Sequence, residues 1–438
     1  MANKYDWEIG KSPPTIDPHS SAKHRVYEEY LAHYIQVLNT NPRIPEFDLT
    51  IVDGFAGGGE YLDINKNLYE GSPTRLIKAA QVGEAAVNII RQNNRINKQF
   101  SLNAEFYFIE KLKSNFKYLE LYLKNCGYAD YINKSIYLYQ TEFVNILPIL
   151  INTIKTKKRA QRCLFFLDQY GYSDVPFSDI RKIFSKLPNA EVLLTFATDH
   201  LIDFMSKDRK YLKLLEKVGL NQILDIEHFL DVKEDTERWR KLVQYELHGS
   251  LLKLSGAKHY TPFFIVSTES NRSFWLVHLS NHPRARDVMT ELHWQLKNHF
   301  SHYGDCGINM FGYDPDRDNS ITGQTDFFDT GEYSFDEIAR ETTKNRLLIE
   351  LPRFLHEKES GIEYGELYAL IANDTPATSN QIKDAIYMLS RQKEILIYKP
   401  SGSIKKATNS IKNNDIIEIN KQSTFLPLQN DLKIRRKK

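Results

Sequence analysis

The sequence is poor in cysteine, and the few cysteines are scattered. Only three of the 438 residues are cysteine: Cys126, Cys163 and Cys306. Their odd number and wide separation argue against a disulfide scaffold, and they form no metal-binding spacing. Such usage is typical of a reducing compartment. We therefore expect a cytoplasmic protein that holds no metal.

Long hydrophobic runs and an excess of charge are also missing. No apolar run approaches the roughly 20 residues that a membrane-spanning helix needs, and the polar N-terminus has no signal-peptide core. The formal net charge is only +2, so any affinity for nucleic acid must come from a local patch. The length predicts more than one domain. We expect a soluble protein with no membrane partner.

The most informative stretch runs from Phe47 to Gly59. Its aliphatic residues Leu49, Ile51 and Val52 predict a short buried strand of a parallel sheet. Asp53 ends this strand at the edge where an open α/β sheet binds ligands, and a carboxylate there suits a cationic amine rather than a pyrophosphate. The glycine-rich turn that follows lacks Cβ atoms at Gly57 and Gly59, so the backbone can bend sharply and lie against a ligand.

The spacing of this turn, Asp-x-Phe-x-Gly-x-Gly, resembles the first motif of S-adenosylmethionine-dependent methyltransferases. Their cofactor carries an amine, a sulfonium and an adenosine but no phosphate, which agrees with an acid at the strand end. We predict that S-adenosyl-L-methionine binds here, against Asp53, Phe55, Gly57 and Gly59.

Two further strand ends are candidates for cofactor binding. Residues 104–110 predict a second strand ending in Glu110, and an acid at this place commonly holds ribose hydroxyls. A third strand, residues 135–139, is followed closely by Gln140 and Glu142. Their side chains either reach the adenine or lie in water.

The helix expected after the glycine turn is delayed. A polar loop, residues 60–70, comes first, and it either covers the cofactor or is a plain insertion. Ser72 is a good N-cap and Pro73 a good first helical residue, so the helix should start there.

A second informative turn follows the predicted fourth strand, residues 163–167. It reads Asp168, Gln169, Tyr170, Gly171. Because the first and fourth strands are neighbours in this type of sheet, the turn should face the methyl group. Methyltransferases acting on exocyclic amines place an acid or amide, a proline and an aromatic here; the acid aligns the amine and the aromatic stacks on a flat base. Asp168 and Tyr170 fit those roles, Gln169 replaces the proline, and an ordinary turn is the alternative.

Two cations lie near the N-terminus. Residues 1–20 look like an extended arm, and a helix is predicted from about Ser21 to Leu38, with Lys23 and His24 in its first turn. Positive charge there opposes the helix dipole. The two side chains are therefore either solvated, or face the crevice and meet an anionic substrate or the cofactor carboxylate.

The remaining pattern predicts an α/β fold, a doubly wound, mostly parallel seven-stranded methyltransferase (Rossmann-like) sheet with a C-terminal winged helix. A fifth strand at 191–196 and a two-strand finish at 261–268 and 274–279 complete the sheet. We place the boundaries as follows: N-terminal arm 1–20, methyltransferase-like domain 21–300, linker 301–342, winged-helix domain 343–425 and basic tail 426–438.

The predicted winged helix has three helices, the first at 347–356, followed by a two-stranded wing. Wing and tail are rich in cations that could contact the phosphates of a nucleic acid. The other interpretation is a protein-docking domain with a solubilising tail. The cations are Lys405, Lys406, Lys412, Lys433, Arg435, Arg436, Lys437 and Lys438.

Taken together, these residues resemble the bacterial three-Cys-motif partner proteins. The resemblance covers most of the chain and implies a methyltransferase-like protein whose partner is a three-cysteine-motif protein related to radical S-adenosylmethionine enzymes. The family usually reads Asp-Pro-Tyr-Gly or Asp-Pro-Phe-Gly after the fourth strand, so Gln169 is a departure that bears on substrate geometry. The residues that carry the resemblance are Lys23-His24, 53–61, Gly71-Ser72-Pro73, 168–171, Asn281-His282-Pro283 and Met289.

The sequence thus favours an S-adenosylmethionine-dependent methyltransferase that acts on an amine nitrogen, with a nucleic-acid base as the expected acceptor. The alternative is a non-catalytic adaptor of the same fold that docks a three-Cys-motif partner or nucleic acid through its winged helix; a small-molecule methyltransferase is a third idea. The predicted roles are cofactor binding for Asp53, Phe55, Gly57, Gly59, Glu110, Gln140 and Glu142, catalysis for Asp168, Gln169 and Tyr170, and substrate contact for Lys23, His24 and Gly171.

Overall fold

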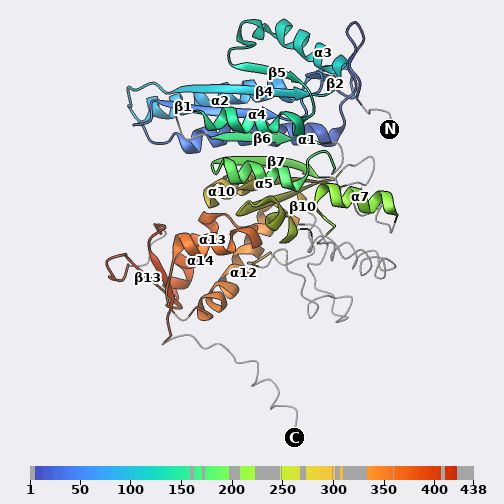
Figure 1. Cartoon of the computed structure of the whole chain (residues 1–438). Helices are drawn as coiled ribbons and strands as arrows, with labels where there is room; N and C mark the ends of the chain where they lie inside the picture. The colour runs from blue at the N-terminus through green and yellow to red at the C-terminus, as the bar shows by residue number, and fades with distance from the viewer. Residues whose placement is uncertain are drawn as a thin grey trace. The chain divides into compact units, whose positions relative to one another are not determined.

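The chain divides into two compact units (Figure 1). The first comprises residues 1–303 with 313–335, and the second residues 304–312 with 336–438. The computed structural model describes residues 5–157, 162–169, 173–196, 208–221, 247, 249–266, 273–297, 299–300, 306–308, 333–358, 360–405 and 410–421.

A seven-stranded sheet organises the first unit (Figure 1). Its order is β5-β4-β1-β6-β7-β9-β8, in which the first five strands run parallel and β9 is antiparallel to both β7 and β8. This order, with a reversed strand inserted before the last, confirms the predicted methyltransferase-like sheet. The strands are β1 (Glu46–Asp53), β4 (Ser101–Glu110), β5 (Ile136–Gln140), β6 (Cys163–Leu167), β7 (Ala190–Phe196), β8 (His259–Val266) and β9 (Ser273–Ser280).

Helices cover both faces of the sheet (Figure 1). On one face, side chains of α1, α2 and α10 join the core cluster that contains Ile51, Phe108 and Phe166. On the other face α4 packs through Phe143 against Phe165, whose ring centroids are 6.3 Å apart. Strand side chains alternate between faces, so neighbouring residues of β6 serve both cores. The helices are α1 (Pro18–Leu38), α2 (Ser72–Asn93), α3 (Lys113–Leu123), α4 (Phe143–Lys155), α5 (Phe177–Lys186), α7 (Arg209–Val218) and α10 (Pro283–Leu296).

Helix α1 begins earlier than predicted. Its first residue is Pro18 rather than Ser21, with proline at the first helical position, where its missing N–H costs nothing. The last residues of the predicted arm therefore belong to the helix.

Residues 60–70 are a hairpin, not the expected polar loop. Strand β2 (Glu60–Leu62) pairs antiparallel with β3 (Leu68–Glu70). The ends of the hairpin meet, because the amide of Gly71 donates to the carbonyl of Gly59 at 2.7 Å. A Cβ on Gly71 would lie 2.7 Å from that oxygen, so the contact requires glycine. The hairpin thus begins and ends at neighbouring points, Gly59 and Gly71, so α2 starts beside the glycine turn.

The N-terminal arm lies over the glycine turn. Trp7 is 2% exposed, and its indole nitrogen donates to the carbonyl of Glu60 at 2.6 Å. Its ring packs edge-on to that of Tyr61, with centroids 5.1 Å apart. Cβ atoms on Gly57 and Gly58 would lie 3.0 and 2.3 Å from the indole. The two glycines therefore make room for Trp7.

Backbone hydrogen bonds attach this arm to the hairpin. The amide of Ile16 donates to the carbonyl of Leu62 at 2.8 Å, and the amide of Leu62 donates to Pro14 at 2.9 Å. Residues 5–17 and 60–70 therefore form one cover over the glycine turn, here called the cap.

The second unit is a winged helix, as predicted. Helices α12 (Glu337–His356), α13 (Tyr364–Ile371) and α14 (Ser379–Arg391) precede a sheet of order β12-β14-β13. Its antiparallel strands are β12 (Ile362–Glu363), β13 (Ile395–Tyr398) and β14 (Ile416–Ile419). Helix α12 starts well before the predicted Leu347, because the Asp336 carboxylate accepts from the amide of Ala339 at 2.9 Å and caps it.

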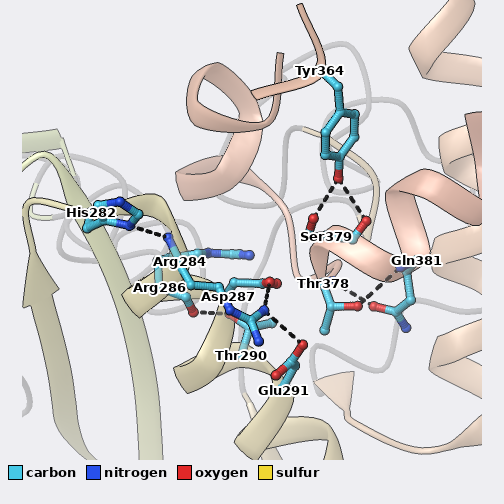
Figure 2. A network of polar contacts seen from close by, with 10 residues as sticks. All are labelled: His282, Arg284, Arg286, Asp287, Thr290, Glu291, Tyr364, Thr378, Ser379 and Gln381. Atoms are coloured by element: carbon cyan, nitrogen blue, oxygen red, sulfur yellow. Dashed lines mark hydrogen bonds and ion pairs between the residues drawn. The ribbon is translucent and has the colours of Figure 1, made fainter. Parts of the chain in front are cut away.

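Two helix starts are fixed by side chains that Figure 2 shows. At α10, Nδ1 of His282 accepts from the amide of Arg284 at 3.1 Å, so the histidine of the Asn-His-Pro motif is a cap. At α14, Thr378 and Gln381 form a reciprocal capping box. The tyrosine hydroxyl of α13, Tyr364, contacts the hydroxyl of Ser379 at 2.7 Å.

One predicted phosphate contact in the wing is wrong. The ammonium of Lys405 pairs with Asp415 at 2.6 Å, and its side chain is only 12% exposed. Burial would raise the pKa of Asp415, but the hydrogen bonds from Lys405 and from the amide of Lys412 hold it below its usual value. Lys405 therefore shapes the wing, while Lys412 remains exposed. The other predicted cations, Lys406 and residues 433–438, lie outside the described residues.

No helix in the described part of the chain combines the length and apolarity that crossing a bilayer requires.

We expect Gly58→Ala to lower the free energy of unfolding by about 1–3 kcal/mol, the usual cost of overpacking. The new methyl group would lie 2.3 Å from Cγ of Trp7. Chemical denaturation measures the change. The matched control is Gly249→Ala, because a Cβ there meets no atom within 4 Å.

A double-mutant cycle tests the cause of that loss. In a Trp7→Ala background the cost of Gly58→Ala should largely disappear, since the clashing ring is gone. Equal costs in both backgrounds would show that the arm does not pack on the glycine turn.

Candidate active site

Three acids meet at one edge of the sheet. Asp53 and Glu110 end the neighbouring strands β1 and β4, and Asp168 directly follows β6 on the other side of β1. In the register of the sheet, Asp53 lies opposite Phe166, two residues before Asp168. Since the carboxyl ends of parallel strands share one edge, the glycine turn after β1 and the first residues after β6 lie at the same edge of the sheet, as the sequence predicted.

Asp53 is a buried carboxyl group with few polar partners. It is 2% exposed; one oxygen accepts from the hydroxyl of Ser72 at 2.7 Å and the other from the amide of Phe55 at 3.1 Å. Burial, aided by the negative charges of Asp168 and Glu110, raises its pKa to about 7, although the two hydrogen bonds oppose this. Asp53 is therefore poised to change charge near neutral pH.

Ser72 has a different role from the predicted one. The N-cap of α2 is Gly71, with no side-chain hydrogen bond, and Ser72 is the first helical residue. Its hydroxyl donates to Asp53 instead. The serine before a proline does mark the start of the helix, as predicted. Its hydroxyl, however, donates to the nearby carboxylate and not to the backbone of the helix.

Glu110 fixes the glycine turn to β4. One oxygen accepts from the amide of Gly57 at 3.1 Å and the other from that of Leu112 at 2.7 Å. Burial raises the pKa of this carboxyl, against the effect of both amides. Each oxygen keeps a further lone pair with which to accept a hydrogen bond from a ligand hydroxyl.

Asp168 is paired with Lys23. The ammonium nitrogen lies 2.5 Å from Oδ1 of the aspartate, and the lysine side chain is 6% exposed. Burial alone would raise the pKa of Asp168, but the charge and hydrogen bond of Lys23 hold it below its usual value. The aspartate is thus ionised at neutral pH. The solvated alternative for Lys23 is wrong. Because α1 begins at Pro18, Lys23 lies in the second turn of the helix, and Asp168 is its partner.

His24 is buried beside this ion pair. It is 3% exposed, and its ring stacks on that of Tyr69 with centroids 5.9 Å apart. Burial, with the charges of Lys23 and Arg75, lowers its pKa to about 3 despite Asp168. Nδ1 of this neutral ring has no hydrogen-bond partner among the described residues, which leaves it able to bond a ligand.

Gln169 holds the turn after β6. Its side-chain oxygen accepts from the amides of Asp174 and Val175, both at 3.0 Å, and its nitrogen donates to the carbonyl of Thr195 at 3.1 Å. The residue is 2% exposed. It replaces the rigidity of a proline with three hydrogen bonds, and all its partners are backbone groups. Tyr170 and Gly171, the other predicted residues of this turn, lie outside the described residues.

The remaining predicted cofactor residues lie around the same edge. Gln140 is exposed and lies opposite Glu110 in the sheet, and exposed Glu142 directly precedes α4 without a side-chain capping bond. The ring centroids of Phe55 and Phe143 are 6.4 Å apart. Gly59 has a φ of +93°, and a Cβ there would lie 2.6 Å from the ring of Tyr122. As at Gly57, the side chain of another residue occupies the space that a Cβ would take, whereas the sequence predicted a ligand beside these glycines.

The cap covers the glycine turn. The sequence left open that residues 60–70 cover the cofactor, but the part played by the N-terminal arm was missed. Tyr61, at the centre of the cap, lies within reach of the charges of Asp168, Asp53 and Glu110. Its ring contacts those of Trp7 and His24 at 5.1 and 6.2 Å. An isolated aromatic in a polar stretch gave no periodic signal, so nothing in the pattern linked Trp7 to the glycine turn.

Comparison with known proteins supports the winged helix. Residues 312–402 match the model of the GMT-like wHTH domain, a winged helix-turn-helix family. The match covers much less than half of the chain. No curated protein sequence matches.

Solved structures show only loose similarity. Protein LPL1258 from Legionella pneumophila is 13% identical, with a TM-score of 0.32 over 59% of this chain and 85% of that one. The O-methyltransferase TomG from Streptomyces achromogenes, solved with S-adenosylmethionine, is 13% identical, with a TM-score of 0.28 over 60% and 90%. A methyltransferase from Agrobacterium tumefaciens is 10% identical, with a TM-score of 0.28 over 61% and 63%. Values this low carry no argument; the fold rests on the strand order.

We expect Gln169→Ala to lower the free energy of unfolding by about 1–3 kcal/mol, because it leaves buried backbone groups without partners. Chemical denaturation of this variant, with exposed Gln81→Ala as control, measures the loss. A stability equal to that of the control would contradict the role of Gln169 in holding the turn.

Proposed function

We propose that the protein is an S-adenosylmethionine-dependent methyltransferase that acts on an amine nitrogen. One observation carries the proposal: two buried carboxyl groups, Asp53 and Glu110, and the partly buried Asp168 lie at one edge of the sheet, and among the described residues only Asp168 forms an ion pair there. Neither Asp53 nor Glu110 forms an ion pair with any described residue. Such a site attracts a cation, and the cofactor carries positive charge on its amine and its sulfonium. A phosphate-bearing cofactor would be repelled.

The cofactor roles follow from the positions of the acids. Asp53 would receive the amine, and the free lone pairs of Glu110 would accept from the ribose hydroxyls. Gln140 and Glu142, beyond Glu110 along the same edge, would border the adenine. Phe55 and the glycine turn, with Gly57 and Gly59, would form the floor. When bound, the cofactor supplies the electrophilic methyl group.

Asp168 is suited to position the acceptor rather than to remove its proton. Lys23 occupies Oδ1 and keeps the carboxylate ionised with a lowered pKa, which makes it a weak base. A carboxylate oxygen can still accept from an amine N–H, and this aligns the nitrogen lone pair with the methyl carbon. Gln169 would act as a positioning residue through the turn, and Tyr170 would stack on the acceptor.

A nucleic-acid base is the acceptor we favour. The Asp-x-Tyr spacing suits a flat ring that carries an exocyclic amine, and the winged helix is compatible with nucleic-acid binding. Lys23, His24 and Gly171 would border the acceptor, with the unpartnered Nδ1 of His24 as a bonding group. The resemblance of the sequence adds a three-Cys-motif protein as partner and a cytoplasmic setting to this proposal.

A non-catalytic adaptor of the same fold is the second candidate, and one observation favours it. The rings of Trp7 and Tyr122 occupy the space next to Gly57, Gly58 and Gly59. A glycine turn covered in this way by protein side chains suits docking without a cofactor. Isothermal titration with S-adenosylmethionine separates the two candidates, because the adaptor needs no cofactor.

Binding of S-adenosylmethionine should strengthen about tenfold as pH rises from about 6 to about 8. The pKa of Asp53, raised to about 7, means that the carboxyl loses its proton over this range. Only the ionised form attracts the cofactor amine. Titration calorimetry at each pH measures the affinity and the proton released.

Asp53→Asn is the decisive comparison for this pH dependence. The cofactor's own amine titrates with either protein, so the difference between the two pH profiles reports Asp53. The variant should bind weakly at every pH and lose most of the dependence, whereas exposed Asp130→Asn should behave as wild type. Identical profiles for wild type and Asp53→Asn would remove Asp53 from the site.

Asp168→Ala should reduce methyl transfer by about 100-fold or more, because the acceptor nitrogen loses its alignment. Cofactor affinity should stay within a few-fold. Transfer of radiolabelled methyl groups to RNA and DNA measures the first quantity and calorimetry the second, with Asp179→Asn as control. Undiminished transfer would show that Asp168 is not catalytic, and the absence of cofactor binding by wild type would favour the adaptor.

A further inference from the structure

Thr195 of β7 lies beside the turn that follows β6. The two strands are parallel neighbours, and their register continues so that Asp168 comes next to Thr195 at the carboxyl edge of the sheet. Side chains at paired positions point to the same face, and two residues earlier Phe166 and Leu193 lie in the core on the α1 side. Asp168 and Thr195 therefore both face α1, and Thr195 is only 1% exposed.

Thr195 contacts the start of this turn through its backbone and through its side chain. Its carbonyl accepts from the side-chain nitrogen of Gln169 at 3.1 Å. Its hydroxyl donates a hydrogen bond to the carboxylate of Asp168, and the direction of this bond is fixed because an ionised carboxylate can only accept. The first two residues after β6 are therefore both attached to one residue of β7.

Tyr27 of α1 holds the threonine hydroxyl from the other side. Its hydroxyl oxygen lies 3.5 Å from Oγ1 of Thr195. Because Thr195 uses its single proton on Asp168, the proton between the two hydroxyls comes from Tyr27. Tyr27 is 2% exposed, and its ring packs edge-on against that of Phe166, with centroids 4.9 Å apart. The core thus fixes the tyrosine, and the tyrosine fixes the threonine hydroxyl.

Helix α1 supplies both outer members of this group. Lys23 and Tyr27 are four residues apart, so they lie on one side of the helix. The ammonium of Lys23 is 2.5 Å from Oδ1 of Asp168, whose side chain is still 23% exposed. The two oxygens of a carboxylate together have about four lone pairs. Lone pairs of Asp168 therefore remain for a ligand after Lys23 and Thr195 have bonded.

The two partners of Asp168 differ in how well they define its orientation. The carboxyl group of an aspartate turns easily about its last torsion. A lysine ammonium lies on a flexible four-carbon stem and rotates freely, so Lys23 fixes the charge of Asp168 but not its direction. Thr195 is β-branched and stands on a buried strand, and its side chain has little rotational freedom. The threonine hydroxyl is therefore the partner that sets the direction.

We propose that Thr195 is a positioning residue for methyl transfer. Its hydroxyl fixes the orientation of the Asp168 carboxylate, which aligns the acceptor nitrogen, and its carbonyl fixes Gln169 and with it the turn. Thr195 acts through these two residues. The inference rests on the proposed methyltransferase function and adds to it the residue that sets the geometry of the acceptor site.

Thr195→Val tests the role of the hydroxyl, because valine keeps the shape of the side chain and the backbone carbonyl. It should lower kcat for transfer of radiolabelled methyl groups to RNA or DNA about tenfold through lost alignment of the acceptor. The affinity for S-adenosylmethionine, measured by calorimetry, should change less than about twofold, because the hydroxyl contacts Asp168 and not the residues assigned to the cofactor. Thr195→Ser keeps the hydroxyl and should keep kcat within about threefold of wild type.

Thr50→Val is the matched control. Thr50 is also a strand threonine that is 1% exposed, and its hydroxyl accepts from the ammonium of Lys157 at 2.5 Å. It pairs with Cys163, the first residue of β6, far along the strand from the turn. Loss of this hydroxyl should leave kcat unchanged. Circular dichroism shows that each variant is folded at the assay temperature.

A kinetic double-mutant cycle separates positioning from a general structural effect. Once Asp168→Ala has removed the carboxylate, the hydroxyl has nothing to orient, and Thr195→Val should lower transfer less than about twofold further. A threonine that only stabilised the fold would cost the same about tenfold in both backgrounds. The costs of Thr195→Val and Asp168→Ala in unfolding by denaturant should also be non-additive, and this second cycle needs no cofactor and no activity.

The possible failures can be told apart. Full activity of Thr195→Val, an equal loss in the Asp168→Ala background, a loss that Thr195→Ser does not restore, or additive unfolding costs would each overturn this inference while an active wild type leaves the proposed function in place. A wild type that neither binds S-adenosylmethionine nor transfers methyl groups would overturn the proposed function, and the role of Thr195 in transfer with it.

Discussion

Three carboxyl groups gathered at one sheet edge, two of them buried and the third, that of Asp168, partly buried, are the constraint on which the site depends. A buried charge is costly unless it is paired or hydrogen-bonded, and each acid meets that cost differently. Asp168 has the ammonium of Lys23 at 2.5 Å. Glu110 has two backbone amides. Asp53 has the weakest compensation, hydrogen bonds from one hydroxyl and one amide, and burial therefore raises its pKa.

This constraint explains local features that otherwise look like anomalies. A lysine buried near the start of α1 would be costly alone, but its ammonium is neutralised by Asp168. Ser72 gives up the usual capping role to bond Asp53. The contact between Gly59 and Gly71 keeps α2, and with it Ser72, beside the strand despite a hairpin insertion. The backbone is arranged around the acids.

The fold was largely predictable from the sequence, because each parallel strand is a short apolar run that ends at an acid or a turn. The acids Asp53, Glu110 and Asp168 follow directly from that pattern, since strand ends meet in space. The winged helix was predictable because its helices carry apolar residues at helical spacing. The early start of α12 was missed, since its N-cap, Asp336, lies in a stretch without periodicity.

The partners of the site were much less predictable. Trp7 reaches the glycine turn, and Lys23 reaches Asp168, through contacts between residues far apart in the chain, which no local pattern encodes. From the sequence, glutamine at position 169 was expected to hold the turn less firmly than a proline. In the structure its side chain holds the turn through three hydrogen bonds to backbone groups. Polar side chains of this kind have several possible partners, and only the fold selects one.

A crystal structure of the protein grown with S-adenosylmethionine tests the central claim most directly. Density for a nucleoside should lie against Gly57, with its ribose hydroxyls on Glu110, its amine beside Asp53 and its methyl carbon directed at the turn that begins at Asp168. A cofactor bound at any other place, or a crevice still filled by Trp7 at saturating cofactor, would contradict the account.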